Sequence, residues 1–310
     1  MYNEDSKGLS YSAGFFILIA FAFVGLLIGT FASIPVWMLM TGQSPLNMAK
    51  DILNPNYANG IRVVQVVSTF FGFFVPAYFA AFLLNRKPIK LLGFKTHFNY
   101  KQFLLMLLIM FAAIFFAGAL SELNQRIPLS KSLTDYFKHL EDTYSDQVQA
   151  TANIKTVQDY IISLIIIALL PAIFEETFFR GGLQNFLTRS TKVPWASILI
   201  ASILFSLAHV SFYGFLWRLA LGIILGLIYQ FTGSLWLSIL GHFFNNGLAV
   251  TEMYILARQG KSVKDSMDET YPLWWGVIAL IVLIVLFYYL KLISNELQKK
   301  YSVASDKLVV

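Results

Sequence analysis

Apolar runs of about 20 residues recur along this chain and are separated by short polar segments. A helix rises 1.5 Å per residue, so a run of this length crosses a hydrocarbon core about 30 Å thick. The runs are continuously apolar and do not alternate in period two, which favours helices over a barrel. The pattern predicts an all-α transmembrane bundle of about eight spans, over residues 12–40, 63–85, 102–121, 157–179, 194–211, 213–232, 235–256 and 273–294.

Composition supports a polytopic membrane protein. Of the 310 residues, 57% are hydrophobic and only 13% are charged, which leaves too little polar surface for a soluble globule. The net charge of +6 is explained by lysines near the membrane surface, which are attracted to anionic lipid, so no nucleic-acid partner is expected. The chain has no cysteine, which excludes thiol chemistry.

Basic residues predict the orientation. The connection between the second and third runs is rich in lysine and arginine and has no acid, so it is expected in the cytoplasm. An even number of spans then places both termini in the cytoplasm, and we expect a multi-pass protein of a bacterial plasma membrane. The basic residues of this connection are Arg86, Lys87, Lys90, Lys95 and Lys101.

The longest polar interruption, residues 122–156, is either an amphipathic helix at the membrane surface or an extended polar loop. Leu133, Phe137 and Leu140 recur at helical spacing among charged residues, which supports the helix. The sequence alone leaves both interpretations open.

Two adjacent acids and an arginine lie near the end of the fourth apolar run. Each such group costs about 2.5–3.5 kcal/mol if it faces lipid, so they are expected to face one another or trapped water in a polar cavity. Glu176 and Arg180 are four residues apart on a helix and can form an ion pair, whereas Glu175 points about 100° away. Glu175 is therefore left to take a proton from water, as a general base does. A charge cluster at a helix end is the alternative, and Pro171 is expected to kink this helix.

Two later runs carry imidazole and amide groups. Phe205 lies one turn before His209, and His242 lies one turn before Asn246. A carboxylate with one imidazole can position and deprotonate water, and a second imidazole with an amide can donate to an oxyanion. These residue types together suit hydrolysis of an acyl bond, although a lone membrane histidine is often only a hydrogen-bonding partner between helices.

The predicted spans conflict with one shared site. They place Glu175 near the inner end of the fourth span and His209 near the outer end of the fifth. The boundary around Phe212 is the weakest of the set, because almost no loop separates the fifth and sixth runs.

Three motifs in order resemble the CAAX prenyl protease type II group, also described as the CPBP (bacteriocin-processing, Abi) intramembrane endopeptidases. They are Glu-Glu-x-x-x-Arg at 175–180, Phe-x-x-x-His at 205–209 and His-x-x-x-Asn at 242–246, and the resemblance covers about residues 157–250. It implies an intramembrane endopeptidase acting on a membrane-associated protein or peptide. On this basis the chain divides into N-terminal helices with the polar loop (1–156), a catalytic helical core (157–256) and a final helix with a basic tail (257–310).

Carried over residue by residue, the resemblance assigns a role to each motif position. It implies that Glu175 activates the water and that His209, supported by Phe205, helps to hold it. His242 and Asn246 would stabilise the oxyanion, and the remaining members, Glu176 and Arg180, would orient the site.

Metal dependence and two other functions stay open. Glu175, His209 and His242 could form a zinc set, but no His-Glu-x-x-His pair is present, and a glutamate-activated water without metal is favoured. The same polar cavity could serve a proton-coupled transporter, although no internal repeat is visible. A non-catalytic membrane partner or immunity-type protein is the other alternative. The 29 Phe and 15 Tyr suit lipid contact and do not predict a prenyl substrate.

Overall fold

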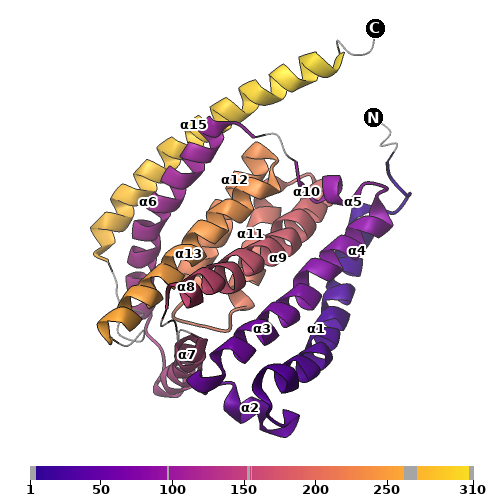
Figure 1. Ribbon diagram of the computed structural model, residues 1–310. Coiled ribbons are helices and arrows are strands. Elements are labelled where there is room, and N and C mark those ends of the chain that lie inside the picture. The colour runs from indigo at the N-terminus through magenta and orange to yellow at the C-terminus, as the bar shows by residue number, and fades with distance from the viewer. Residues whose placement is uncertain (1–4, 96–97, 152–153, 155, 262–270, 307–310) are drawn as a thin grey trace.

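The computed structural model describes residues 5–95, 98–151, 154, 156–261 and 271–306, and this part of the chain is a bundle of helices (Figure 1). Within these residues the only β pairing is an isolated bridge between Ser6 and Asn85. The α-helices are α1 Tyr11–Thr41, α2 Met48–Asp51, α3 Ala58–Thr69, α4 Val75–Leu84, α5 Pro88–Leu91, α6 Tyr100–Gln125, α7 Lys131–Thr151, α8 Val157–Ser163, α9 Leu170–Glu176, α10 Asn185–Thr191, α11 Pro194–Leu207, α12 Phe215–Thr232, α13 Leu235–Gln259 and α15 Leu273–Asp306.

Short helical segments of other types join or interrupt these helices. The 3₁₀ turns η1 and η2 cover Pro45–Asn47 and Pro55–Tyr57. Three π-helical segments, in which the backbone bonds skip one residue more than in an α-helix, are η3 Phe70–Phe74, η4 Leu164–Leu169 and η5 Thr177–Gln184.

The membrane bundle is confirmed, but the expected count of eight spans is not. Among the described residues six helices are long and apolar enough to cross a membrane. The expected span 194–211 is the 14-residue helix α11, which at about 21 Å is too short to cross. The expected span 235–256 is the 25-residue helix α13, whose polar residues keep it out of the six. The six are Tyr11–Thr41, Pro55–Leu84, Tyr100–Gln125, Val157–Thr191, Phe215–Thr232 and Leu273–Lys299.

The fourth span differs most from its predicted boundaries. It runs from Val157 to Thr191, twelve residues beyond the expected end at Phe179, so the acidic pair lies in the interior of the helix and not at its end. It is built from α8, η4, α9, η5 and α10 in succession. Pro171 lies at the start of α9, directly after η4, so the proline falls where the α-helical bonding pattern is already interrupted. The π-helical segments therefore flank the acidic pair on both sides.

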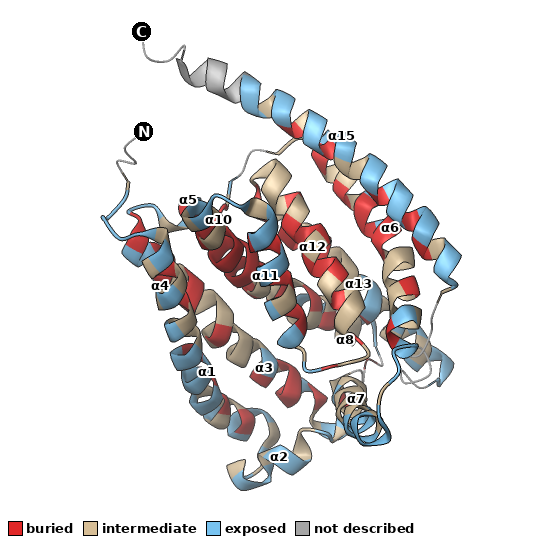
Figure 2. Ribbon diagram, turned by 180° about the vertical axis from the view of Figure 1, so that it is seen from behind, coloured by how far each residue is buried: buried red, intermediate tan, exposed pale blue. Residues whose placement is uncertain are grey.

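The helices that carry the candidate site lie inside the bundle. In Figure 1, α6 and α15 run side by side along one flank, and α1, α3 and α4 form the other. In Figure 2, burial is concentrated on α12 and on the π-helical segment η5 that precedes α10, whereas α1 and α15 turn long exposed faces outwards. Large apolar side chains such as Phe16, Phe31, Val277 and Ile284 cover those faces. An apolar exterior of this kind is suited to lipid contact.

Close packing between α1 and η3 depends on glycines, most clearly on Gly25. A Cβ atom at Gly25 would lie 2.0 Å from the backbone oxygen of Phe71, which cannot move away as a side chain can. Small residues allow helices in a membrane to approach in this way. Helix α1 is thereby held against η3. The ring of Phe70 in η3 contacts the ring of Phe174 in the fourth span, Val157–Thr191, which carries Glu175 and Glu176 and is called the acidic helix.

The polar interruption forms the helix α7, so the helical interpretation is the one that the structure supports. Its apolar and acidic residues contact the connection that follows α11: the rings of Phe137 and Phe212 stack at 4.3 Å, and Ser211 Oγ donates to Glu141 at 2.8 Å. At its other end, Arg62 of α3 donates to the carbonyl oxygen of Thr151. Helix α7 thus ties the α11–α12 connection to the N-terminal helices.

Candidate active site

A buried ion pair forms the centre of the site. Arg180 Nη1 lies 2.6 Å from Glu176 Oε1, and the exposed fractions of the two side chains are 1% and 0%. Arg180 Nη2 donates to the carbonyl oxygen of Gly222 on α12 at 3.1 Å. The contact between Glu176 and Arg180 is the one that their i,i+4 spacing predicts. The bond to Gly222 also ties the pair to the neighbouring helix α12.

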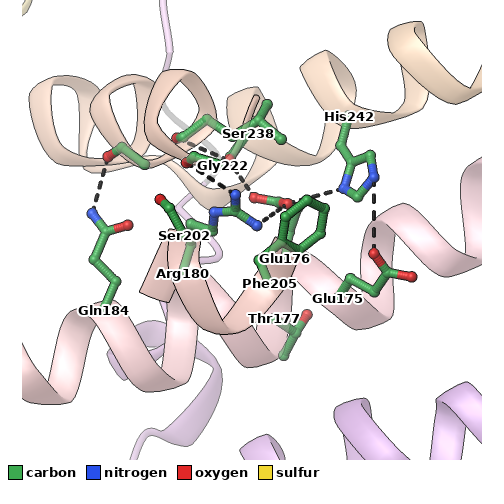
Figure 3. A network of polar contacts seen from close by, with 12 residues as sticks. Glu175, Glu176, Thr177, Arg180, Gln184, Ser202, Phe205, Gly222, Ser238 and His242 are labelled. Carbon is green, nitrogen blue, oxygen red and sulfur yellow. Dashed lines mark hydrogen bonds and ion pairs between the residues drawn. The ribbon is translucent and has the colours of Figure 1, made fainter. Parts of the chain in front are cut away.

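Glu176 accepts hydrogen bonds from two further donors, both on α13. Ser238 Oγ donates to Oε2, and His242 Nδ1 lies 3.0 Å from Oε1. Figure 3 shows Arg180, Ser238 and His242 converging on this carboxylate. Three donors around a fully buried acid stabilise its ionised form. An ionised carboxylate can only accept, so the proton on this edge of the His242 ring belongs to Nδ1.

His242 joins the two glutamates. Its Nδ1 is occupied by Glu176, and its Nε2 lies 3.9 Å from Glu175 Oε2. This separation is too long for a direct hydrogen bond. In Figure 3, Glu175 lies beside His242, on the side of the ring away from the Arg180 guanidinium. The Glu175 side chain is 13% exposed, whereas Glu176 is fully enclosed. The adjacent acids thus occupy different environments, and Glu175 is the more accessible of the two.

Phe205 brings the second motif to the same place. Its ring lies 4.9 Å from the His209 ring, 5.6 Å from the His242 ring and 4.9 Å from the Arg180 guanidinium carbon. His209 Nδ1 lies 2.9 Å from the Phe205 carbonyl oxygen. A single buried phenyl ring therefore contacts a member of each of the three motifs and fixes their mutual position.

His209 lies beyond the end of α11, in the connection to α12. The helix ends at Leu207, and Val210 has a φ of +50°. This is the left-handed region, which a β-branched residue rarely adopts. Strained backbone of this kind is concentrated at functional sites, where the surrounding contacts maintain it. The turn places His209 next to Phe205.

This geometry removes the conflict in the predicted spans. Because the acidic helix continues to Thr191, Glu175 lies deep within it, and because α11 is short, His209 lies after an interior helix end. Both residues can then lie at the same depth. The sequence placed Glu175 and His209 near opposite membrane faces because it set the end of the fourth span too early and the end of α11 too late.

Asn246 is the motif member that the structure does not join to the network. It is half-buried, one turn beyond His242 on α13. In the described part of the chain, the polar contact it makes is with Asn245, whose Nδ2 lies 3.4 Å from Asn246 Oδ1. Its amide is therefore left available to another group.

Sequence reasoning missed two supports of the buried Glu176–Arg180 ion pair. Ser238 lies one turn before His242 on the same face of α13, a spacing that could have suggested it. The carbonyl oxygen of Gly222 could not be found in this way, because any residue carries a carbonyl. Gly222 on α12 faces Ser202 on α11. A Cβ atom at Gly222 would lie only 2.8 Å from Ser202 Cβ, so α11 and α12 can approach here because residue 222 has no side chain.

The donors do not form a ready metal site. Within the described ranges, no three His, Asp or Glu side chains are grouped so as to hold a metal ion. Glu176 already occupies one nitrogen of His242, and the Phe205 carbonyl lies against one nitrogen of His209. The Nε2 atoms of these histidines would be the ligands, because a metal-bound histidine usually has its other ring nitrogen hydrogen-bonded to a carboxylate or a carbonyl oxygen.

The fold and the site define a polytopic membrane protein with a buried carboxylate–imidazole network. Residues 157–248 match the family model described as type II CAAX prenyl endopeptidase Rce1-like. The chain therefore carries an Rce1-like domain over these residues. The matched region begins at α8 and ends within α13. The family is one of proteases, which supports an intramembrane endopeptidase in general. The chain matches none of the curated proteins and none of the solved structures compared with it.

Proposed function

We propose that this protein is an intramembrane endopeptidase that hydrolyses a peptide bond of a membrane-associated protein or peptide with a water activated by Glu175. One observation carries the proposal. Glu176 is fully buried and bound by three donors, whereas Glu175 is partly exposed and lies near the Nε2 atom of His242. A base must be able to reach its substrate, and Glu175 is the acid that can.

In the proposed reaction, Glu175 takes a proton from water, and the water oxygen attacks the carbonyl carbon of the scissile bond. The resulting oxyanion accepts hydrogen bonds from Nε2 of a doubly protonated His242 and from the side-chain amide of Asn246. Glu175 then returns the proton to the leaving nitrogen as the carbon–nitrogen bond breaks. The products are a carboxylic acid and an amine.

The remaining residues hold this geometry. Glu176, itself anchored by Arg180 and Ser238, accepts the Nδ1 proton of His242 and so fixes the orientation of its ring. This is the role that the third member of a nucleophile–base–orienting triad has in other hydrolases. His209 is proposed to hold the water opposite Glu175, and Phe205 keeps His209 in place.

A panel of membrane-embedded and C-terminal-tail peptides tests the proposed function. We expect the detergent-purified protein to cleave at least one of them, and the His209→Ala and His242→Ala variants to lose that cleavage while they remain folded. Peptides with and without a prenyl group determine whether a lipid tail is required. Cleavage that persists unchanged in both variants would show that the reaction occurs at another site.

Chelation tests the proposed metal independence. With a glutamate as base and imidazole and amide groups as donors, every step has a protein group to perform it, so we expect the cleavage rate to be unchanged after exhaustive dialysis against a chelator. A zinc-dependent protease treated in parallel serves as the control and should lose its activity. If the rate falls and stoichiometric zinc restores it, then Glu175, His209 and His242 are to be assigned as zinc ligands.

The proposed placement in the membrane follows from the basic residues. The start of α1 and the end of α15 lie at the same end of the bundle (Figure 1), as expected if both termini face one compartment. We propose that this compartment is the cytoplasm and that the membrane is a bacterial plasma membrane.

A further inference from the structure

A cavity with charged, polar and apolar lining lies at the end of the bundle where α1 begins and α15 ends. It has a volume of about 1180 Å³ and is independent of the proposed catalytic residues. Lys87, Lys90 and Lys95 line it, together with neutral polar and aromatic side chains, and no Asp or Glu is among its lining residues. The cavity is therefore a concentrated positive region.

The cavity lies at the ends of four membrane-spanning helices. The second span ends at Leu84 and the third begins at Tyr100, and the cavity is lined by the connection between them. It also reaches Thr232, where the fifth span ends, and Gln298, next to the end of the sixth at Lys299. Where spans end together, the hydrocarbon core gives way to lipid headgroups. The cavity is thus at headgroup depth.

The structure holds the lysines in place through their backbone. The carbonyl oxygen of Gly93 accepts from Leu235 N at 2.8 Å, and the carbonyl oxygen of Lys95 accepts from Ser234 Oγ, so this segment is fixed to the α12–α13 turn. Lys87 directly precedes the one-turn helix α5 and Lys90 lies within it, and both line the cavity. The cationic lining is built into the fold.

Two of the three lysines are not paired with a carboxylate in the part of the chain that the structure describes. Lys87 lies 3.1 Å from Asp5, but Lys90 and Lys95 form no ion pair with any acid in the described ranges. Although the Lys95 side chain is exposed, protein atoms around it partly desolvate its ammonium group, and this desolvation and the neighbouring charges of Arg189 and Lys90 lower the pKa of Lys95 from its ordinary value. A bound anion would lower the electrostatic repulsion between like charges that are held together in this way.

The lining is amphipathic, which indicates the kind of anion. Phe94, Phe98 and Leu297 lie beside the lysines and the amide of Gln298. A free inorganic anion would make no favourable contact with the aromatic and aliphatic side chains of this lining. The glycerol and first acyl carbons of a phospholipid would pack against them. We propose that this cavity binds the phosphate headgroup of an anionic membrane lipid, with Lys90 and Lys95 as its main cationic contacts.

Lipid binding to the full chain tests the proposal. The protein is purified in a neutral detergent and titrated with phosphatidylglycerol or with phosphatidylcholine of the same acyl chains, and bound lipid is counted by native mass spectrometry. We expect the wild type to prefer phosphatidylglycerol and the Lys90→Gln/Lys95→Gln variant to bind it about 20- to 30-fold more weakly, from about 1 kcal/mol per lysine. Both lysines are exposed, so the variant should unfold at the same temperature as the wild type in phosphatidylcholine.

The Lys101→Gln/Lys192→Gln variant is the matched control. It removes the same charge from exposed lysines that do not line the cavity, and it should keep the preference. Loss of the preference in both variants would mean general surface attraction and overturn the proposal. Inorganic phosphate and glycerol phosphate, added alone, distinguish a lipid from a free anion: if either saturates the site as well as phosphatidylglycerol does, the lipid assignment is wrong.

Discussion

Glu175→Gln is expected to lower kcat for peptide cleavage by about 10²–10⁴-fold, the usual contribution of a positioned general base. Glutamine has the same shape as glutamate but cannot accept a proton from water. The substitution should leave KM nearly unchanged, because an interaction needed only in the transition state does not alter substrate binding. Cleavage of the best peptide of the panel under single-turnover conditions measures the effect.

The structure predicts that this loss is not caused by unfolding. Glu175 is partly exposed, and its nearest charged partner in the site is His242 at 3.9 Å, so its charge is not needed to hold the helices together. The free energy of unfolding of Glu175→Gln should match that of the wild type. Glu296→Gln, at an exposed carboxylate on α15, is the control and should change neither rate nor stability.

Either of two results would refute the assignment of the base. If Glu175→Gln keeps the wild-type rate, another group activates the water. If a membrane function other than proteolysis is found and it survives this substitution, the non-catalytic interpretation gains support. If the protein is a proton-coupled transporter, Glu175→Gln should abolish both transport and proton coupling, and neither the wild type nor any variant should cleave peptide.

The second large effect is expected at Arg180. Arg180→Met should lower the free energy of unfolding by about 3–5 kcal/mol, because it leaves the Glu176 carboxylate buried without its cation. Glu176 is fully enclosed, so water cannot replace the lost contact. Reversible denaturation in mixed micelles, followed by tryptophan fluorescence, measures the change.

A comparison within the same chain isolates the contribution of burial. Glu122 on α6 and Arg126, directly after its end, have the same i,i+4 spacing and lie 2.7 Å apart, but the arginine side chain is 61% exposed. Arg126→Met should therefore cost no more than about 1 kcal/mol. If the two arginine variants lose equal stability, the buried pair is not what holds the acidic helix.

The double variant Glu176→Gln/Arg180→Met completes the test. Replacement of both partners removes the uncompensated charge, so the double variant should be more stable than Arg180→Met alone. It should nevertheless cleave peptide poorly, because a neutral amide at position 176 no longer presents a carboxylate to His242 Nδ1. Recovery of stability without recovery of activity would separate the folding role of this network from its orienting role.

The sequence by itself determined the membrane class, the helical bundle and the pairing of Glu176 with Arg180. These depend on local quantities. Apolarity over about 20 residues reports a membrane span, and the helical repeat places residues four apart on one face whatever surrounds them. The same repeat separated Glu175 from Glu176. The resemblance of the three motifs to a protease family also needed only residue types and spacing.

Tertiary structure decided which groups meet across helices and where the helices end. Ser238 and the carbonyl of Gly222 contact Glu176 and Arg180 only because α12 and α13 pack against the acidic helix. The span count failed because hydropathy does not show that α11 stops at Leu207 or that the fourth span continues to Thr191. Contacts between helices depend on the packing of whole surfaces, which no local pattern in one chain encodes. The depth of the site and the path between its residues therefore required the fold.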